Sequence, residues 1–307
     1  MREALSVVIP VYNAEQSLPL LLSALADELP RLATSFEVIL VNDGSLDESW
    51  TVVASLAAKY AFVRGFDLMR NYGQHNALLA GLRHVRYPIV VTMDDDLQHP
   101  PTEIIHLLDA LTDKQDVVYG VPETMQHTFL RSLASRAMKI ALQNAMGADT
   151  ARNISAFRAF RTQIREAFAD YKNPFVSLDV LLTWGTTRFT AIKVIHEPRR
   201  LGQSNYTVWK LFTHAANMVT GFSALPLQLA TYIGFFFSLF GIGVLFLVIA
   251  RFFFVGDPVP GFPFLAAIIA LFSGAQMFAL GIIGEYLGRM HGRLLDKPSY
   301  AIRESKG

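Results

Sequence analysis

The chain has 307 residues, with 27 lysines and arginines against 26 aspartates and glutamates. This near balance provides no global positive field, which argues against a nucleic-acid-binding protein. Cysteine is absent, and this excludes disulfides and thiolate metal sites. The length suits one large domain with an appendage or two small domains, and no secretory signal peptide is expected at the start.

Over residues 1–200, strand-like runs alternate with helical periodicity, a pattern typical of an α/β domain with a mostly parallel sheet. Apolar runs predict strands at 5–11, 36–41, 63–68, 89–93, 117–121 and 189–195. Helical spacing is clearest at 16–32, 49–59, 75–85 and 101–111. Polar clusters follow the first four strands, at 12–15, 42–45, 70–73 and 94–96. Each could be ordinary turn chemistry, but together they favour a ligand pocket beyond the carboxyl ends of the strands.

Three consecutive carboxylates, Asp94, Asp95 and Asp96, follow the apolar strand predicted at 89–93. Three like charges at a strand end are costly unless a positive group binds there. A divalent cation carrying a phosphate ester would supply that charge, and Gln98 could add an amide oxygen. The alternative is an acidic strand-to-helix turn in which Asp96 only caps the next helix.

The apolar excess of the chain is concentrated in its last third. No Asp, Glu, Lys or Arg occurs at 211–250, and a second uncharged stretch covers 258–284. Because about 20 apolar residues span a bilayer, we predict a C-terminal two-helix transmembrane hairpin at 225–288, with spans at about 227–250 and 262–284. A buried helical hairpin in a soluble core is the alternative.

Basic residues cluster before and after this hairpin, whereas the connector holds only Arg251 against Asp257. The positive-inside bias therefore predicts a multi-pass protein of the inner (plasma) membrane, with both termini and the catalytic domain in the cytoplasm. Residues 201–224 would be a juxtamembrane amphipathic segment and 289–307 a cytoplasmic tail. A second amphipathic stretch at 127–146 fits either the membrane surface or an ordinary protein core.

Three blocks of the sequence resemble the signatures of glycosyltransferase family 2. They are 8–13 (Val-Ile-Pro-Val-Tyr-Asn), 41–45 (Val-Asn-Asp-Gly-Ser) and 93–100 (Met-Asp-Asp-Asp-Leu-Gln-His-Pro). With the hairpin, the chain is similar to the polyprenyl-phosphate branch, which includes dolichyl-phosphate mannose synthase, bactoprenol glucosyltransferases and undecaprenyl-phosphate aminoarabinose-type transferases. The resemblance implies a GT-A fold and inverting transfer from a nucleotide sugar, with UDP favoured over GDP, to a polyprenyl (undecaprenyl or dolichyl) phosphate.

The resemblance also assigns roles to individual residues. The nucleotide-sugar-binding residues would be Pro10, Tyr12, Asn13, Glu15, Asp43, Asp94 and Asp95. The ligands of a Mg²⁺ or Mn²⁺ cofactor would be Asp94, Asp96 and Gln98. Taken singly, Tyr12 could instead be a packing aromatic, and Glu15 a first-turn helix charge favoured by the helix dipole.

On the acceptor side, the resemblance covers blocks 153–158 (Asn-Ile-Ser-Ala-Phe-Arg) and 199–206 (Arg-Arg-Leu-Gly-Gln-Ser-Asn-Tyr). The candidate acceptor-phosphate ligands are Arg158, Arg199, Arg200 and Ser204, and the candidate catalytic residues are Asp96, Arg158 and Arg199. Asn153, Ala156 and Asn205 depart from the usual acidic residues and lysine, so no acid/base role is expected for the first block. A lipid phosphate, with a second pKa of about 6, is already a nucleophile at neutral pH. For Arg200, a basic patch attracted to anionic lipid is the alternative.

These features predict a membrane-anchored, metal-dependent transferase of cell-envelope glycan or lipopolysaccharide modification. One alternative is a family 2 polysaccharide synthase, although processive members usually carry a Gln-x-x-Arg-Trp block and more spans. Another is a catalytically silent nucleotide-binding membrane subunit, against which the intact Asp94, Asp96 and Gln98 argue. A Rossmann dehydrogenase is excluded because no Gly-x-Gly-x-x-Gly turn follows the first strand. The sequence leaves open the sugar, the lipid length, the choice of metal and whether the protein is a homo-oligomer.

Overall fold

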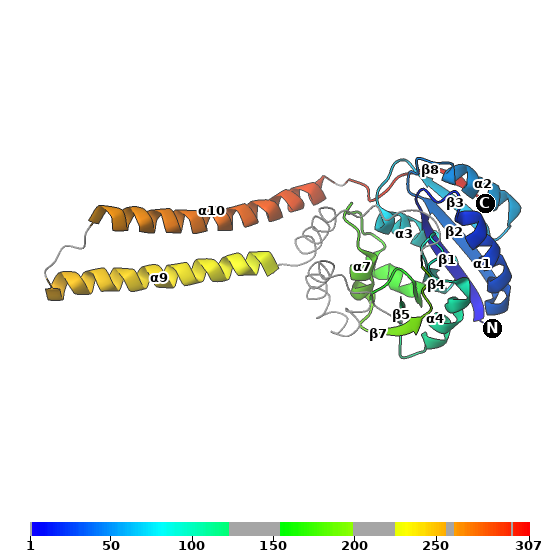
Figure 1. The fold of residues 1–307 in the computed structure, drawn as a ribbon, viewed down its shortest axis with the longest axis horizontal. Helices are drawn as coiled ribbons and strands as arrows, with labels where there is room; N and C mark the ends of the chain where they lie inside the picture. The colour runs from blue at the N-terminus through cyan, green and yellow to red at the C-terminus, as the bar shows by residue number, and fades with distance from the viewer. Residues whose placement is uncertain (1, 123–153, 199–224, 256–260, 296) are drawn as a thin grey trace. The chain divides into compact units, whose positions relative to one another are not determined.

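The structure, a computed structural model, describes residues 2–122, 154–198, 225–255, 261–295 and 297–307 (Figure 1). The chain divides into two compact units, Met1–Phe212 with Asp296–Gly307, and Thr213–Leu295. The amphipathic segments predicted at 127–146 and 201–224 lie outside the described residues, as do Arg199, Arg200 and Ser204.

The described part of the first unit is built on an eight-stranded sheet with the order β7-β5-β6-β4-β1-β2-β3-β8. The strands are β1 (Arg2–Val11), β2 (Ala33–Asn42), β3 (Val63–Leu68), β4 (Ile89–Thr92), β5 (Val117–Pro122), β6 (Arg158–Arg161), β7 (Phe189–Val194) and β8 (Ile302–Lys306). β6 runs antiparallel to β4 and β5, and β8 runs antiparallel to β3, while the other neighbours are parallel. The predicted α/β fold with a mostly parallel sheet is therefore confirmed.

The apolar run of β1 reflects its place in the middle of the sheet. Leu5, Val7, Val8 and Ile9 are all 0% exposed, because helices cover both faces of this strand. One face packs against α1 (Leu18–Leu32), α2 (Ser49–Lys59) and α4 (Ile104–Ala110), which follows the 3₁₀ turn η1 (Pro101–Glu103). α3 (Gln74–Leu82) covers the other face, where a Cβ on Gly81 would lie 2.4 Å from Val8 Cγ1.

Helix α1 shows how the sequence pattern produces this packing. Its buried positions are Leu18, Leu21, Leu22, Leu25, Leu29 and Leu32. This spacing of three and four residues places all six leucines on one stripe of the helix, which faces the sheet. The chain then turns directly into β2, so that β1, α1 and β2 form one parallel crossover unit.

Three elements of the first unit were not predicted from the sequence. They are β6, helix α7 (Leu178–Gly185) and β8, and a further 3₁₀ turn, η2 (Thr162–Phe168), lies between the first two. The segment 289–307 was expected to be only a cytoplasmic tail, but it contributes the edge strand β8 (Figure 1). The α/β domain therefore includes residues far beyond its predicted end at 200.

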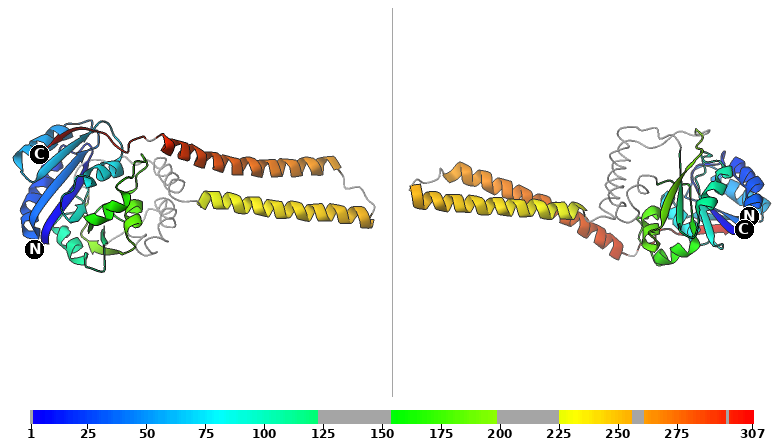
Figure 2. Two further views of the ribbon diagram at one scale, coloured as in Figure 1. Left: turned by 180° about the vertical axis from the view of Figure 1, so that it is seen from behind. Right: turned by 90° about the horizontal axis from the view of Figure 1, so that it is seen from below.

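The second unit contains two long helices, α9 (Leu225–Val255) and α10 (Gly261–Leu294). They run antiparallel and contact each other, as the left view of Figure 2 shows, and the rings of Phe237 and Phe272 meet edge to face with centroids 5.8 Å apart. Among the described residues, no helix combines the length and the apolar character needed to cross a membrane. The transmembrane hairpin at 225–288 thus stays a prediction from the sequence.

Candidate active site

The candidate site lies at the rim of the sheet, which we define as the carboxyl ends of the neighbouring parallel strands β4, β1, β2 and β3. The loop at 12–15 follows β1, the loop at 42–49 follows β2, and the loop at 69–73 follows β3. The acidic run, Asp94 to Asp96, comes shortly after β4. The strand order therefore places the four polar clusters of the sequence beside one another, as is usual for ligand sites in open α/β sheets.

The loop after β1 is held by side chains through four consecutive backbone N–H groups. The donor and acceptor pairs are Tyr12 N to Asp95 Oδ2 (3.1 Å), Asn13 N to Ser45 Oγ (3.0 Å), Ala14 N to Ser49 Oγ (2.8 Å) and Glu15 N to Asp47 Oδ2 (3.2 Å). These bonds support Asn13 in a left-handed conformation, with a φ of 53°. The ring of Tyr12 remains 44% exposed at the rim.

Asn13 and Glu15 also use their side chains to hold the neighbouring loop. Asn13 Oδ1 accepts the N–H of Leu46 at 2.8 Å, and Glu15 Oε2 accepts the N–H of Glu48 at 3.0 Å. Two residues assigned to nucleotide-sugar binding therefore shape the site through contacts within the protein. These contacts could not be predicted from the sequence, because the partners lie more than 30 residues away along the chain.

Asp43 joins the loop after β2 to the loop after β3. Its side chain is buried and accepts the N–H of Tyr72 at 2.7 Å and of Gly73 at 2.8 Å. Burial raises the pKa of Asp43 to about 6, although these two bonds and the charge of Arg70 act against the rise. Gly44 permits the close approach of the loops, because a Cβ at this position would lie 2.5 Å from Asn71 N.

The acidic run is tied to three different parts of the rim. Asp94 Oδ1 accepts the side-chain amide of Gln74 at 2.6 Å, and Asp96 Oδ1 accepts the N–H of Gln98 at 3.1 Å. Asp95 accepts the Tyr12 N–H. Burial raises the pKa of Asp95 to about 7, and the charges of Asp94 and Asp96 add to this effect.

The three adjacent carboxylates, Asp94 to Asp96, place negative charge at this point of the rim, which fits a site for a cation. The donor atoms are carboxylate and amide oxygens, which suit Mg²⁺ or Mn²⁺. Among the described residues, however, no group of three or more His, Cys, Asp or Glu side chains could hold a metal ion.

The loop after β7 supports the acidic run from the side. The N–H of Glu197 donates to Gln98 O at 2.8 Å, and the rings of His196 and His99 meet edge to face with centroids 4.9 Å apart. His99 also stacks on Phe157. Burial lowers the pKa of His99 to about 4, and the neighbouring His196 adds to this effect. The sequence did not point to this support, since β7 is far from the acidic run along the chain.

Arg158 is placed differently from its predicted role as an acceptor-phosphate ligand. Its side chain is only 2% exposed and forms an ion pair with Asp179 on α7. Asp179 also accepts the hydroxyl of Tyr119 at 2.9 Å, and the Arg158 guanidinium lies 5.7 Å from the ring centroid of Tyr119. The charge of Arg158 is thus buried and neutralised within the protein. In this structure Arg158 ties β6 and β5 to α7. Its role as an acceptor-phosphate ligand stays a prediction from the sequence.

A family model described as "Glycosyl transferase family 2" matches residues 6–170, which is more than half of the chain. The chain belongs to glycosyltransferase family 2. An undecaprenyl-phosphate 4-deoxy-4-formamido-L-arabinose transferase of Sodalis glossinidius (strain morsitans) is 33% identical over 304 residues, which cover 98% of this chain and 93% of that protein. The transferase of the same name from Serratia proteamaculans (strain 568) is 34% identical over 305 residues, covering 98% and 94%.

Solved structures show the same fold for this family 2 chain. Glucosyl-3-phosphoglycerate synthase from Mycobacterium tuberculosis, crystallised with Mn²⁺, UDP-glucose and phosphoglyceric acid, superposes with a TM-score of 0.53. The match covers 71% of this chain and 78% of that one at 17% identity. At this identity the likeness shows a shared GT-A-like α/β arrangement.

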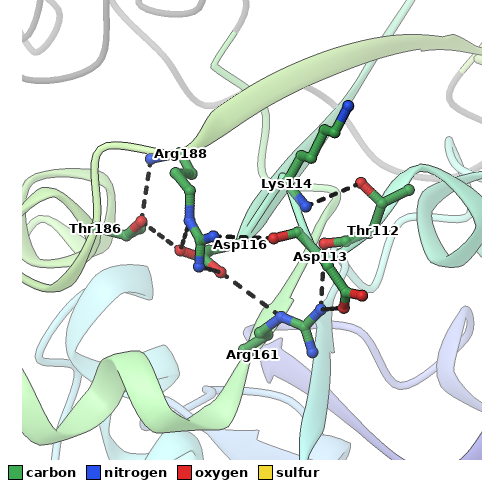
Figure 3. A network of polar contacts seen from close by, with 7 residues as sticks. All are labelled: Thr112, Asp113, Lys114, Asp116, Arg161, Thr186 and Arg188. Carbon is green, nitrogen blue, oxygen red and sulfur yellow. Dashed lines mark hydrogen bonds and ion pairs between the residues drawn. The ribbon is translucent and has the colours of Figure 1, made fainter.

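A separate polar network, drawn in Figure 3, lies at the amino ends of β5 and β7. Asp116, just before β5, accepts two bonds from Arg188, just before β7, at 2.9 and 2.8 Å. Thr186 donates to Asp116 at 2.6 Å, and Arg161 at the end of β6 lies 3.6 Å away. This network fastens three strands together and takes no part in the candidate site.

Proposed function

We propose that the protein transfers a sugar from a nucleotide sugar to a polyprenyl phosphate at the cytoplasmic face of a membrane. The observation that carries this proposal is the likeness to two transferases named for an undecaprenyl-phosphate acceptor, which extends over 98% of the chain. It includes the C-terminal helices as well as the family 2 domain. A likeness confined to the family 2 domain would fit many other acceptors.

On the donor side, we assign Asp94, Asp96 and Gln98 to a Mg²⁺ or Mn²⁺ ion, and Pro10, Tyr12, Asn13, Glu15, Asp43 and Asp95 to the surroundings of the nucleotide sugar. A bound ion would neutralise the charge that develops on the diphosphate leaving group. The structural relative with Mn²⁺ and UDP-glucose supports a divalent cation and a UDP-sugar. Asp95 keeps the loop after β1 next to the acidic run through the Tyr12 N–H.

On the acceptor side, a lipid phosphate that is largely dianionic at neutral pH needs positioning more than it needs a general base. We assign this positioning to Arg199, Arg200 and Ser204, which precede the C-terminal helices in the sequence. Arg158 is left out of the assignment because Asp179 already pairs with its charge.

We further propose that α9 and α10 form the membrane hairpin of an inner-membrane protein. Many large apolar side chains on both helices are exposed, among them Phe236 at 67%, Phe246 at 68% and Met277 at 67%. The strand order adds an independent argument. Because β8 follows the hairpin and pairs with β3, a membrane can be crossed only an even number of times between them. Both termini would then share the side of the catalytic domain.

The activity test uses membranes that contain the full chain, a panel of labelled UDP- and GDP-sugars, and undecaprenyl phosphate. We expect a lipid-soluble, acid-labile product only when the acceptor and Mg²⁺ or Mn²⁺ are both present. D96N should abolish the product. D113N, which changes a fully exposed carboxylate before β5, far from the rim, should not. Product formation by wild type and D96N in EDTA would overturn the metal assignment. A polymeric product would favour a polysaccharide synthase, and nucleotide binding without turnover would favour a silent subunit.

The topology test exploits the absence of cysteine from the sequence. A single cysteine introduced as Gly256→Cys should react with a membrane-impermeant maleimide added from outside intact cells. A matched cysteine introduced as Ser305→Cys, on β8, should react only after the cells are opened. Labelling of Gly256→Cys only in opened cells would overturn the proposed hairpin.

A further inference from the structure

The edge strand β8 and the residue just before it, Ala301, make specific contacts with the loop after β3. The N–H of Met69 donates to Ala301 O at 2.9 Å, and an N–H of the Arg303 guanidinium donates to Met69 O at 2.8 Å. β8 therefore holds this loop at its first residue. The family 2 match ends at residue 170, so it assigns no role to this strand.

Arg303 also forms an ion pair with Asp67, a buried residue of β3. Its guanidinium lies 3.2 Å from Asp67 Oδ2, and the side chains are 57% and 3% exposed, respectively. The other carboxylate oxygen, Asp67 Oδ1, accepts the side-chain amide N–H of Asn42 at 2.7 Å. Asp67 is thus a buried carboxylate with an arginine on one oxygen and an asparagine on the other, and loss of either partner would be costly.

From Asn42, the hydrogen bonds continue to the loop after β1. Ser45 donates to Asn42 Oδ1 at 2.5 Å, and Ser45 Oγ accepts the backbone N–H of Asn13 at 3.0 Å. We call the series Arg303, Asp67, Asn42, Ser45, Asn13 the relay.

The groups of each side chain determine which one donates and which one accepts in every bond of the relay. A guanidinium only donates, so the Asp67 carboxylate must accept from it. The amide of Asn42 then turns its N–H₂ toward Asp67 and its oxygen toward Ser45. The single proton of Ser45 is consequently used on Asn42, which leaves a lone pair for the N–H of Asn13. Each bond therefore orients the next group.

A second connection leads from β8 to Asp43. β8 fixes Met69, and three and four residues later the N–H groups of Tyr72 and Gly73 donate to the two oxygens of Asp43. The same strand thus supports two loops of the proposed donor site, through side chains in the relay and through the backbone of the loop after β3.

We propose that Arg303 is a positioning residue for the nucleotide sugar, which it orders through the relay and the loop after β3 without touching it. This inference rests on the proposed function for the identity of the ligand. It gives a role in donor binding to a strand that is separated from the rest of the catalytic domain by the C-terminal helices.

The test compares Arg303→Gln with Glu304→Gln in the purified full-length protein. Glu304 lies on the same strand and binds Trp50 Nε1 at 3.2 Å and Lys306 at 2.6 Å, but it is not part of the relay. We expect R303Q to raise the KM for the UDP-sugar about tenfold, which corresponds to about 1.4 kcal/mol, with little change in kcat or in the KM for polyprenyl phosphate. E304Q should leave all three constants near those of the wild type. Arg303→Lys, which keeps one positive charge, should give an intermediate KM.

A double-mutant cycle tests the route of the effect. If Arg303 acts through the relay, R303Q combined with S45A should bind the donor little worse than S45A alone. Fully additive losses would overturn the route through the relay, and equal donor KM values for R303Q and E304Q would overturn the inference as a whole. If R303Q does not fold, the same comparison is made with R303K.

Hydrogen exchange without any ligand separates this inference from the proposed function. The amides of residues 12–15 should exchange faster in R303Q than in the wild type, and E304Q should leave them protected. This result is expected whatever the substrate is. Unchanged exchange at 12–15 in R303Q would overturn the positioning role, even if the wild type proves to be the proposed transferase. An inactive wild type with the expected exchange would overturn only the assigned ligand.

Discussion

The backbone N–H of Tyr12 donates to Asp95 Oδ2 at 3.1 Å. This bond links the loop after β1 to the acidic run after β4, across two strands that are neighbours in the sheet. It gives the middle carboxylate of the run a partner within the protein. The flanking Asp94 and Asp96 are instead tied to Gln74 and to the N–H of Gln98.

This relationship predicts that Asp95→Asn is milder than Asp95→Ala. An asparagine keeps an oxygen that can accept the Tyr12 N–H, whereas an alanine leaves that donor without a partner. We expect D95N to stay within about fivefold of the wild-type kcat/KM and D95A to lose about tenfold, the equivalent of about 1.4 kcal/mol. Equal losses in both variants, measured by steady-state kinetics, would show that the negative charge of Asp95 is what matters.

Gln74 is expected to position Asp94 for the metal. Gln74→Ala removes the 2.6 Å bond to Asp94 Oδ1, so the Mn²⁺ concentration for half-maximal activity should rise by a few fold. Gln74→Glu should be worse than Gln74→Ala, because it places another negative charge beside the acidic run. Metal titrations of activity measure both effects. A Q74E variant that needs less Mn²⁺ than the wild type would contradict the assignment.

Asp43 should make the stability of the protein depend on pH. Burial raises its pKa in the folded state to about 6, above the ordinary value of 3.8. Its contribution to stability is therefore fully present below about pH 4 and is lost as the pH rises through about 6.

The measurement compares the wild type with Asp43→Asn by denaturant unfolding at pH 4.5 and pH 7.5. The stability of the wild type relative to D43N should fall by on the order of 2 kcal/mol over this range. Any change in stability that comes from replacing the carboxylate with an amide is the same at both pH values, so it cancels in the comparison. A relative stability that stays constant or rises with pH would contradict the prediction.

The network around Asp116 is expected to matter for stability and not for donor binding. Burial alone would raise the pKa of Asp116, but hydrogen bonds from Thr186 and Arg188 outweigh it, and the pKa lies below its ordinary value. Its contribution is thus present above about pH 4 and is lost as the pH falls through the lowered pKa.

Asp116→Asn should reduce the unfolding free energy at pH 7 by about 1–2 kcal/mol, a modest figure because Arg188 is 55% exposed. The KM for the nucleotide sugar should not change. D113N, which affects only the exposed bond to Arg161, serves as the control and should cost much less. A raised donor KM in D116N would show that the Asp116 network is coupled to the candidate site at the rim.

The pair formed by Arg158 and Asp179 allows a test of whether the arginine stabilises the fold or binds the acceptor phosphate. Asp179→Ala leaves a buried guanidinium without its partner and should destabilise the fold by about 3–5 kcal/mol. The double variant R158M/D179L should be less destabilised than D179A, because it removes both charges together. Thermal unfolding of the three proteins measures this. If R158M alone raised the KM for the lipid phosphate at full stability, the acceptor role would be restored.

The elements that the sequence predicted well are those with strong local signals. The strand expected at 63–68 and the helix expected at 49–59 match β3 and α2 in both bounds. A central parallel strand such as β1 is apolar on both faces, and a helix packed on the sheet such as α1 carries an apolar stripe, so each pattern lies within one short window. The acidic run was also evident locally, because three like charges at a strand end are unusual in any fold.

The elements that were missed depend on distant parts of the chain. β8 has the sequence Ile-Arg-Glu-Ser-Lys, and as an edge strand with exposed side chains it lacks an apolar pattern. β6 has only four residues. The partners of the site residues, such as Ser45 for Asn13 and Asp179 for Arg158, are determined by strand order and helix packing. No spacing in the sequence indicates them.

The position of β8 also has a consequence for how a newly made chain folds. Met69 and Arg303, which meet in the finished sheet, are 234 residues apart in the sequence. While the ribosome is making the intervening residues, the outer edge of β3 has no strand to pair with and exposes its backbone N–H and C=O groups. Such an open edge is a template for aggregation, and the long separation slows its closure. The growing chain therefore carries an open sheet edge at β3 until β8 leaves the ribosome.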